Sequence, residues 1–383
     1  MPADAATLRS ALADRLDDVA VLTRTLVEVD SPTADAAGVR RVQQELADAL
    51  AAQGFTCAWL PVGDAGLDVL DAELRFGDGP TVLVLGHADT VWPAGTAATW
   101  PFERAGGVWS GPGVGDMKSC LALAVHALAA LVATAAPTRG AVRMLVIPDE
   151  EDGSVASRPA IEAAAREAVA CLTLEAARPD GGLVTSRGAV GAMAIEARGR
   201  AAHVTDPGPH RDALAPLVRV AAGIAELDVP GASAAVGVVR GGTARQIVAE
   251  RAEALVDLRA DTTDAAERLA DAVRALVAAE QGGDAEIEAH GGVTRPAFPR
   301  SDGTAALYAA ASDAATELGQ PVHEVAERGG SDASFAAALG VPTLDGLGPI
   351  CHGSCSRDER IEEASLPVFG ALLALLVASA LDG

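Results

Sequence analysis

The chain has almost no lysine, few cysteines and no long apolar run, and each shortage argues against a class of protein. Lys118 is the only lysine, and 29 basic residues face 53 acidic ones, for a formal net charge of −24. Binding of nucleic acid or of an anionic membrane requires basic patches that this balance can hardly provide. We therefore expect neither of these partners.

The cysteines are an odd number and are scattered along the chain, at Cys57, Cys120, Cys171, Cys351 and Cys355. Such a set does not make the disulfide framework of a secreted domain. Residues 1–30 carry acidic side chains throughout and contain no uninterrupted apolar core, which argues against a secretory signal. We expect a cytoplasmic protein.

The most apolar stretch, residues 366–381, is too short to span a bilayer comfortably. It begins Ser365-Leu366-Pro367, which is typical of an N-cap followed by a first helical turn. This stretch therefore predicts a buried terminal helix rather than a membrane anchor.

A chain of 383 residues favours two domains over one. Helical spacing at 8–27 and 37–53 precedes short strand-like runs at 81–85, 141–147 and 170–174, which alternate with helical stretches at 119–135 and 158–169. This alternation predicts an α/β domain. From about Arg187 the pattern changes to strands at 191–197, 234–239 and 253–259 with helices at 212–226 and 264–281. That order suits an inserted α+β sandwich, with residues 291–299 as the returning linker.

Acidic or imidazole side chains follow the predicted strands or glycine turns at four places. They are His87-x-Asp89, Gly113-Val114-Gly115-Asp116-Met117-Lys118, Asp149-Glu150-Glu151-Asp152 and Leu174-Glu175. The carboxyl ends of strands in an open α/β sheet are where sites lie. Taken singly, each cluster could be a structural hydrogen bond, a turn residue or a solvated acidic face. Together they deliver carboxylates repeatedly to one sheet edge.

Several like charges gathered at a cleft repel one another unless cations offset them. A metal centre is therefore the economical explanation. Oxygen-rich ligands with one or two imidazoles suit Zn²⁺ or a similar divalent ion, and a shared aspartate could hold two ions about 3.5–4 Å apart.

Four motifs occur in one order: Gly86-His87-Ala88-Asp89-Thr90, Gly113-x-x-Asp116-x-Lys118, Asp149-Glu150-Glu151-x-Gly153-Ser154 and Gly329-Gly330-Ser331-Asp332. In this the chain resembles the dinuclear zinc amidohydrolases that include glutamate carboxypeptidase (carboxypeptidase G), acetylornithine deacetylase and succinyl-diaminopimelate desuccinylase. The likeness runs from the first helix to the last. It implies a zinc-peptidase-like catalytic domain over residues 1–187 and 299–383, with a mixed, mostly parallel sheet flanked by helices. It also implies an inserted dimerisation or lid domain over residues 188–298.

The resemblance also implies roles for single residues. His87 and Glu175 would bind one Zn²⁺, Glu151 the other, and Asp116 would bridge them, with Co²⁺ or Mn²⁺ as alternative ions. Glu150 would be the general base. Asp89 would hold the His87 ring in the tautomer that offers its free nitrogen to the metal.

In the inserted domain, Gly199-Arg200-Ala201-Ala202-His203 matches a turn whose histidine, in dimeric relatives, reaches the partner's active site and stabilises the oxyanion. Arg259 in Val256-Asp257-Leu258-Arg259 would hold a substrate carboxylate. Gly330 and Ser331 would also contact substrate. The non-catalytic alternatives are a structural role at an interface for His203 and an exposed salt bridge for Arg259.

The sequence departs from the family at three positions. Anchored on Gly348-Pro349 and on Asp358-Glu359, Cys355 falls where the last ligand is normally histidine, and a thiolate is a competent zinc ligand. His352, three residues earlier, is the alternative ligand, and an impaired site with one tightly held ion is a further alternative. Gln246 and Asp212 replace asparagines that meet the substrate or the oxyanion.

The leading hypothesis is a homodimeric, zinc-dependent amidohydrolase that cleaves the amide bond of an N-acyl amino acid or peptide-like substrate next to a free carboxylate. Two alternatives stay open. The same metal site could serve amide formation, cyclisation or acyl transfer in biosynthesis, or the chain could be a catalytically silent dimer that binds a small carboxylate.

Overall fold

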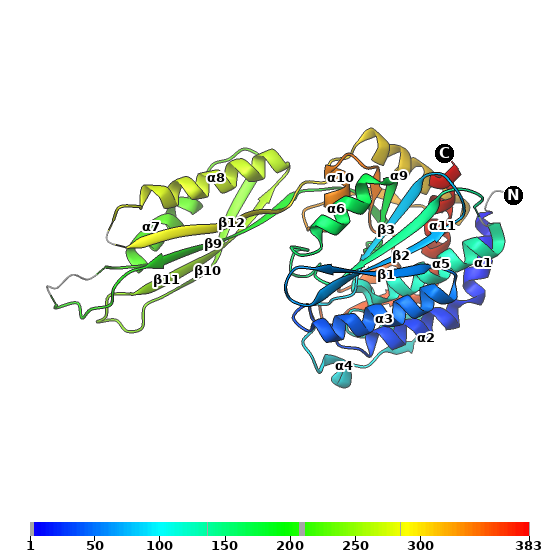
Figure 1. The fold of residues 1–383 in the computed structure, drawn as a ribbon, viewed down its shortest axis with the longest axis horizontal. Coiled ribbons are helices and arrows are strands. Elements are labelled where there is room, and N and C mark those ends of the chain that lie inside the picture. The colour runs from blue at the N-terminus through cyan, green and yellow to red at the C-terminus, as the bar shows by residue number, and fades with distance from the viewer. Residues whose placement is uncertain (1–3, 136, 207–210, 284, 383) are drawn as a thin grey trace. The chain divides into compact units, whose positions relative to one another are not determined.

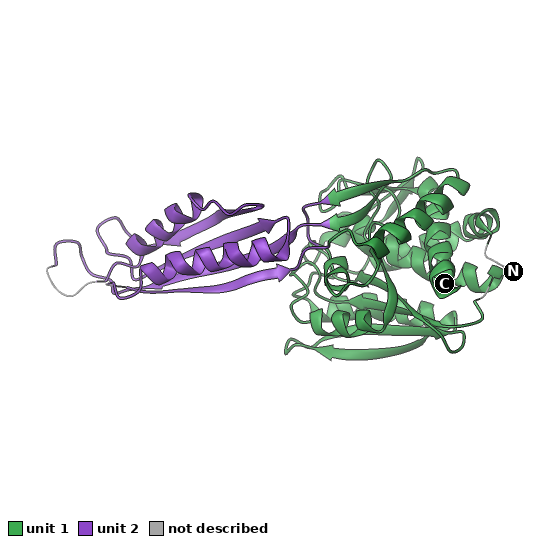
Figure 2. Ribbon diagram, turned by 90° about the horizontal axis from the view of Figure 1, so that it is seen from above, with its two compact units in different colours: residues 1–186, 299–326, 331–383 green, residues 187–298, 327–330 purple. Residues whose placement is uncertain are grey.

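The protein is described from a computed structural model, in which residues 4–135, 137–206, 211–283 and 285–382 are placed. The chain forms two compact units, coloured separately in Figure 2. Unit 1 comprises residues 1–186, 299–326 and 331–383, and unit 2 comprises residues 187–298 and 327–330. Arg187 and Glu327–Gly330, which were expected in the catalytic domain, thus belong to unit 2.

Unit 1 contains a six-stranded mixed sheet (Figure 1) in the order β1-β2-β6-β3-β7-β14. The strands are β1 (Thr56–Val62), β2 (Leu67–Arg75), β3 (Thr81–His87), β6 (Ala141–Ile147), β7 (Ala168–Thr173) and β14 (Thr343–Leu344). The four strands from β6 to β14 are mutually parallel, and β2 is antiparallel to both of its neighbours, β6 and β1. The predicted mixed, mostly parallel α/β sheet is confirmed, but β1, β2 and β14 were not predicted from the sequence.

Both faces of the sheet are covered by helices, because its central strands are apolar on both sides. In β3, Val82 and Val84 belong to one core and Leu83 and Leu85 to the other. The first core includes α1 (Ala5–Asp14), α2 (Leu16–Val27), α3 (Ala36–Ala52), α5 (Ser119–Ala135), α9 (Asp302–Glu317) and α11 (Leu366–Asp382). The second includes α6 (Arg158–Arg166) and α10 (Ala333–Ala338). The helical spacing at 8–27 is interrupted at Arg15, so it yields two helices instead of one.

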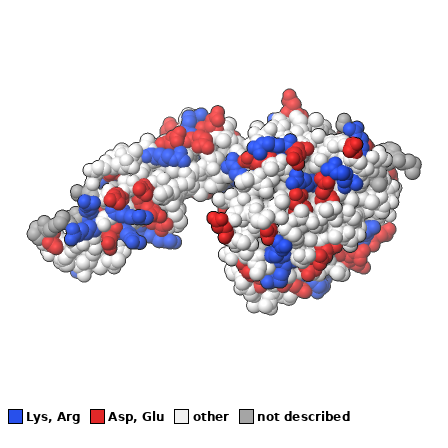
Figure 3. All heavy atoms as spheres, in the orientation of Figure 1, with Lys and Arg blue, Asp and Glu red and all other residues white. Residues whose placement is uncertain are grey.

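Two apolar segments, Val114–Ala135 and Glu363–Asp382, are long and apolar enough to cross a membrane by length and composition. Most of each segment lies buried within unit 1, where α5 and α11 pack against one another and against α1. They are core helices of this unit, so the buried terminal helix predicted for residues 366–381 is confirmed, although the Ser365 hydroxyl bonds to Ile350 N and Glu362 O instead of capping α11. On the face drawn in Figure 3, acidic side chains are interspersed with the arginines.

A small antiparallel sheet in unit 1 matters for the site. Its order is β15-β16-β5-β4, with β4 at Glu103–Ala105, β5 at Val108–Ser110, β15 at Cys351–His352 and β16 at Arg360–Glu362. The hairpin between β15 and β16 carries residues 353–359. The strand β5 runs directly into the glycine-rich loop before α5. The sheet therefore brings two segments about 240 residues apart in sequence beside one another.

Unit 2 is an antiparallel four-stranded sheet in the order β10-β11-β9-β12, with two helices packed on one face. Its elements are β9 (Ala189–Arg198), α7 (Leu214–Ala225), β10 (Ala232–Gly241), β11 (Arg251–Ala260), α8 (Thr263–Ala279) and β12 (Glu286–Arg295). The α+β arrangement of this insertion matches the sequence analysis. The assignment of residues 291–299 to a linker is wrong for Gly291–Arg295, which pair with β9 as the end of β12.

Candidate metal centre

His87 is the last residue of β3 and is almost completely buried, with 1% of its side chain exposed. Its Nδ1 lies 3.0 Å from the backbone oxygen of Asp89 and 3.3 Å from the Asp89 carboxylate. Because a carbonyl oxygen can only accept, Nδ1 carries the proton and donates it. The other ring nitrogen, Nε2, therefore faces the carboxylates of the site.

Asp116 follows β5 in a tight loop that precedes α5. Gly113 has a left-handed backbone with φ of 72°, which favours glycine. At Gly115 a Cβ atom would lie 2.2 Å from Cys351 Sγ, so only glycine fits there. These two glycines allow the loop to pack against β15 and direct Asp116 toward His87.

Glu150 and Glu151 lie in a turn after β6, so the expectation that this pair is off a regular strand is confirmed. The turn is held by Asp89, whose two carboxylate oxygens accept hydrogen bonds from Glu150 N and Glu151 N, both at 3.1 Å. Asp89 therefore orients two motifs, the histidine and the glutamate pair. Further along the turn, the Ser154 hydroxyl donates to the Asp332 carboxylate, which ties the third motif to the fourth.

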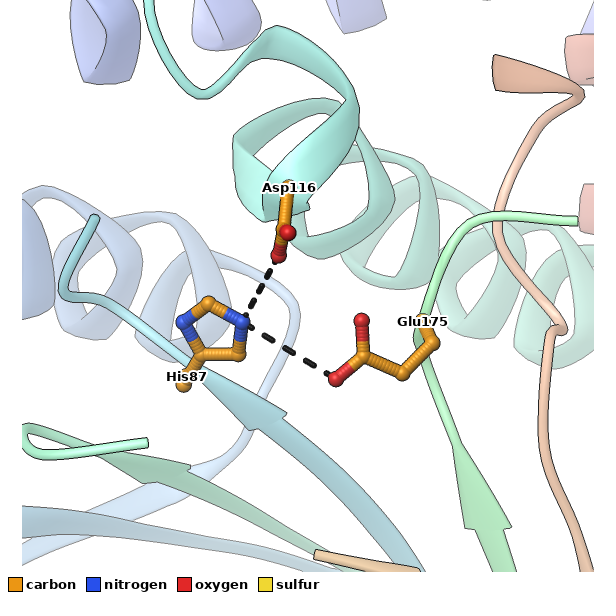
Figure 4. Close-up of side chains that lie close together, drawn as sticks. All are labelled: His87, Asp116 and Glu175. Atoms are coloured by element: carbon orange, nitrogen blue, oxygen red, sulfur yellow. Dashed lines mark hydrogen bonds and ion pairs between the residues drawn. The ribbon is translucent and has the colours of Figure 1, made fainter. Parts of the chain in front are cut away.

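Three side chains from separate elements converge in Figure 4. His87 Nε2 lies 3.0 Å from Asp116 Oδ1 and 3.9 Å from Glu175 Oε1, and Glu175 comes from the segment after β7. One ligand atom from each of these residues lies within 4.8 Å of the other two. This is the first group that could hold a cation.

Cys355 lies on the β15–β16 hairpin, in a left-handed backbone conformation with φ of 59°. Its Sγ is 3.3 Å from Asp116 Oδ2, which also accepts a hydrogen bond from Ser354 Oγ at 3.0 Å. Ligand atoms of Asp116, Glu151 and Cys355 form the second group within 4.8 Å. His352 Nε2 instead lies 2.8 Å from Glu362 Oε1. Asp116 therefore belongs to both groups, and Cys355 rather than His352 completes the second.

The electrostatics of the cluster suit divalent cations. Burial, together with the neighbouring Asp116 charge, raises the pKa of Glu151 to about 8 and that of Glu175 well above its ordinary value. Burial alone would lower the pKa of His87, but hydrogen bonds to Asp116 and Asp89 raise it well above normal. The buried Glu151 Oε1 has no hydrogen-bond partner in the described part of the chain. Nitrogen, oxygen and thiol ligands around an orphaned carboxylate oxygen fit a pair of zinc-like ions.

The raised pKa of Glu151 predicts a pH-dependent stability in the metal-free protein. Between pH 4.5 and about 8 the unfolded chain has released this proton and the folded protein keeps it, so stability falls as pH rises, at up to roughly 1.4 kcal/mol per pH unit. Urea unfolding with chelator at several pH values measures this slope. In Glu151→Gln, whose side chain cannot ionise, the fall in unfolding free energy with pH should be smaller by up to that amount per pH unit. An equal dependence of stability on pH in both proteins would contradict the raised pKa of Glu151.

Three residues predicted to meet the substrate belong to unit 2, where they make local contacts. His203 is exposed, and its Nδ1 lies 2.8 Å from Thr205 Oγ1. Asp212 Oδ1 accepts a hydrogen bond of 2.9 Å from Leu214 N at the start of α7. Gln246 contributes its backbone oxygen to Val204 N. Of these, Asp212 has a structural role as an acceptor at a helix start, which an asparagine could fill equally well.

Arg259 is half-exposed, and its Nε and Nη2 donate to the Asp257 carboxylate at 2.7 and 2.9 Å. It lines a hollow of about 260 Å³ in unit 2 together with Arg328. A substrate carboxylate at this fork would have to replace Asp257. Gly330 is half-buried in unit 2, whereas Ser331 is buried in unit 1, where its hydroxyl accepts from Ala333 N at the start of α10.

Two buried charged side chains next to the cluster, Glu359 and Lys118, had been given no role from the sequence. Glu359 accepts hydrogen bonds from the backbone of the Asp116 loop, and burial raises its pKa to about 7. Lys118 donates to Val29 O at 2.6 Å, and burial lowers its pKa to about 7. The signal available for Lys118 was its uniqueness in the chain, combined with its place in the Asp116 motif.

Comparisons with known proteins also indicate a peptidase-like enzyme. The sequence profile of "Peptidase family M20/M25/M40" matches residues 83–379. Carboxypeptidase G2 of Pseudomonas sp. (strain RS-16) is 26% identical over 354 residues, which cover 89% of this chain and 84% of that protein. Succinyl-diaminopimelate desuccinylase of Paracoccus denitrificans (strain Pd 1222) is 31% identical over 285 residues, which cover 69% and 73%.

The fold also has a solved counterpart. The M20 family metallo-carboxypeptidase Sso-CP2 from Sulfolobus solfataricus superposes with a TM-score of 0.76 at 15% identity, covering 94% of this chain and 99% of that one. At this identity the likeness concerns the fold alone.

Proposed function

Because the chain belongs to peptidase family M20/M25/M40 and is thus a metal-dependent hydrolase of amide bonds, we propose that it cleaves an amide next to a free carboxylate with two zinc ions. The observation that carries the two-ion proposal is the sharing of Asp116 between two groups of ligand atoms. A carboxylate with one oxygen toward His87 and the other toward Cys355 is suited to bridge two cations.

His87, Asp116 and Glu175 would hold the first ion, and Asp116, Glu151 and Cys355 the second. Zn²⁺ accepts all of these ligand types, and Co²⁺ or Mn²⁺ could take its place. Burial and the Asp116 charge raise the pKa of the Cys355 thiol, so the thiol stays protonated until a cation favours the thiolate. When bound, the two ions would polarise the scissile carbonyl and make water nucleophilic at neutral pH.

Glu150 would move the proton. It lies beside Glu151 in the turn that Asp89 holds, and only 9% of it is exposed. A carboxylate in this position can take a proton from the attacking water and deliver it to the departing amine nitrogen. The rigid support of its backbone by Asp89 keeps the carboxylate in place between the two transfers.

The substrate class is proposed from the relatives and from unit 2. One relative is a carboxypeptidase and the other removes a succinyl group from an amine. An N-acyl amino acid or a dipeptide satisfies both chemistries. Arg259 would bind the free carboxylate in exchange for Asp257, and Gln246, Asp212, Gly330 and Ser331 would contact the rest of the molecule. His203 would stabilise the oxyanion in the partner's site, in a cytoplasmic homodimer.

The test is a substrate panel offered to purified protein loaded with two equivalents of Zn²⁺ or Co²⁺. The panel pairs N-acyl amino acids and dipeptides with the same compounds carrying a carboxamide at the free carboxylate. We expect cleavage of the free acids at least about tenfold faster, since one charge-assisted Arg pair is worth at least 1.4 kcal/mol. No cleavage across the panel would refute the hydrolase proposal, and formation of amide from amine and acyl donors would favour the biosynthetic alternative.

A further inference from the structure

Glu359 is a buried carboxylate, 1% exposed, on the same hairpin as Cys355. Its Oε1 accepts hydrogen bonds from Gly115 N at 2.8 Å and from Asp116 N at 3.1 Å. Two successive backbone N–H groups therefore converge on one oxygen. The side chain of Asp116 reaches the candidate metal centre, while its backbone N–H is hydrogen-bonded to Glu359.

The second oxygen of Glu359 has a partner of its own. Its Oε2 accepts a hydrogen bond of 3.2 Å from Trp92 Nε1. The Trp92 indole is fixed by an edge-to-face contact with Trp100, with ring centroids 5.1 Å apart. The Arg357 guanidinium lies 5.4 Å from the Trp92 ring and 5.2 Å from the Trp100 ring. The indole N–H is therefore aimed at Glu359 by a small rigid cluster.

The hairpin links these contacts to the second ligand group. Glu359 N donates to Ser356 O at 3.0 Å, which closes the turn next to Cys355. From this turn Cys355 Sγ approaches Asp116 Oδ2. One hairpin thus supplies both the thiol and the carboxylate that fixes the backbone of Asp116, so the relative position of thiol and shared aspartate depends on Glu359.

On the basis of the proposed function, we propose that Glu359 is a positioning residue for the two-ion centre: through the N–H groups of Gly115 and Asp116 it holds the bridging carboxylate in register with Cys355. Mutation of residues that orient metal ligands by hydrogen bonds typically lowers metal affinity about 10–100-fold. Glu359 differs from a general structural residue in that its loss should change ion binding in protein that is still folded.

The substitution Glu359→Gln tests this, because glutamine keeps an oxygen for the two backbone N–H groups but turns an NH₂ group toward the Trp92 N–H. Two donors then face each other, and the side chain must move. The second substitution Trp92→Phe removes the opposing donor. Both E359Q and E359Q/W92F lack the Glu359 charge. A difference in ion affinity between them therefore reports the position of the side chain and not the loss of its charge. Glu362→Gln is the matched control, since Glu362 contacts His352 on the same hairpin.

Zn²⁺ and Co²⁺ dissociation constants are measured by calorimetry on each apo-protein, with thermal melting as the check of folding and the Co²⁺ absorption spectrum as the report of geometry. We expect E359Q to weaken ion binding 10–100-fold, E359Q/W92F to return within about threefold of wild type, and E362Q to be unchanged. Wild-type affinity in E359Q, or equal weakening in E362Q, overturns the inference. So does a double variant as weak as E359Q.

If E359Q does not fold, Glu359→Asp, whose shorter side chain cannot keep all three contacts, takes its place with the same criterion of 10–100-fold weaker ion binding, and failure of both to fold assigns Glu359 a purely structural role. The proposed function stands apart in this experiment. Wild-type protein that binds no divalent ion refutes the two-ion proposal itself, whereas wild-type binding with an indifferent E359Q refutes only the role of Glu359.

Discussion

Replacing Glu150 with glutamine is expected to lower kcat by about 10²–10⁴-fold while the protein retains both metal ions. Glutamine preserves the size of the side chain and the backbone contacts of the turn with Asp89. It cannot carry a proton from the attacking water to the leaving nitrogen. The measurement combines kcat with metal content of the same preparation, on a substrate that the panel identifies.

Asp152→Asn is the matched control for this substitution. Asp152 lies in the same turn and is exposed, so removing its charge should change kcat less than about threefold. A Glu150→Gln enzyme that keeps most of its activity would show that another group moves the proton. An enzyme that loses its metal along with its activity would show that Glu150 is needed to build the centre.

Replacing Cys355 with alanine is expected to remove the second ion, so that the protein binds one equivalent of Zn²⁺ or Co²⁺ instead of two. Alanine leaves Asp116 and Glu151 as the ligands of that site. Loss of an orienting partner costs about 10–100-fold in metal affinity, so loss of a ligand should cost more than about 100-fold. The Co²⁺ protein should also lose the near-ultraviolet charge-transfer band of a thiolate ligand. Titration followed by absorption spectroscopy measures both effects.

Three further variants make the Cys355 result specific. Cys355→His should restore the second equivalent without the thiolate band, since imidazole is an equivalent zinc ligand. His352→Ala should bind two ions, because His352 is directed to Glu362. Cys57→Ser, which removes a thiol outside both ligand groups, should match wild type. A second ion that survives in Cys355→Ala and disappears in His352→Ala would reverse the assignment.

The strand ends of the candidate site were readable from sequence because buried strands have a strong local signature. His87 closes the apolar run of β3 and Glu175 follows that of β7. Parallel neighbours bring such ends to one edge of the sheet, so the convergence followed from topology. The outer strands were not readable in this way. In β2 the acidic residues Asp68, Asp71 and Glu73 are half-buried and interrupt the apolar residues, which weakens the apolar signal.

Two glycines account for the wrong prediction of a linker at the end of the insertion. Gly291 and Gly292 have φ values of 90° and 158°, and as a pair they look like a linker in the sequence. The pairing of β12 with β9 keeps both residues in the sheet, with a register irregularity between Val293 and Arg295. Long-range pairing therefore overrode the local preference of these glycines.

The sequence by itself indicated the candidate ligands and their order, because metal chemistry restricts the residue types and strand ends restrict where they stand in the chain. Only the tertiary structure distinguished the candidates Cys355 and His352, since it groups Cys355 with Asp116 and Glu151 and directs His352 to Glu362. They lie three residues apart, so spacing could not separate them, and the hairpin with its left-handed backbone at Cys355 turns the thiol toward Asp116. Only the structure could assign Asp89 and Glu359 their hold on the ligand loops. Both act on backbone N–H groups, which every residue except proline has, so the motifs that contain these two residues do not reveal which N–H groups they bind.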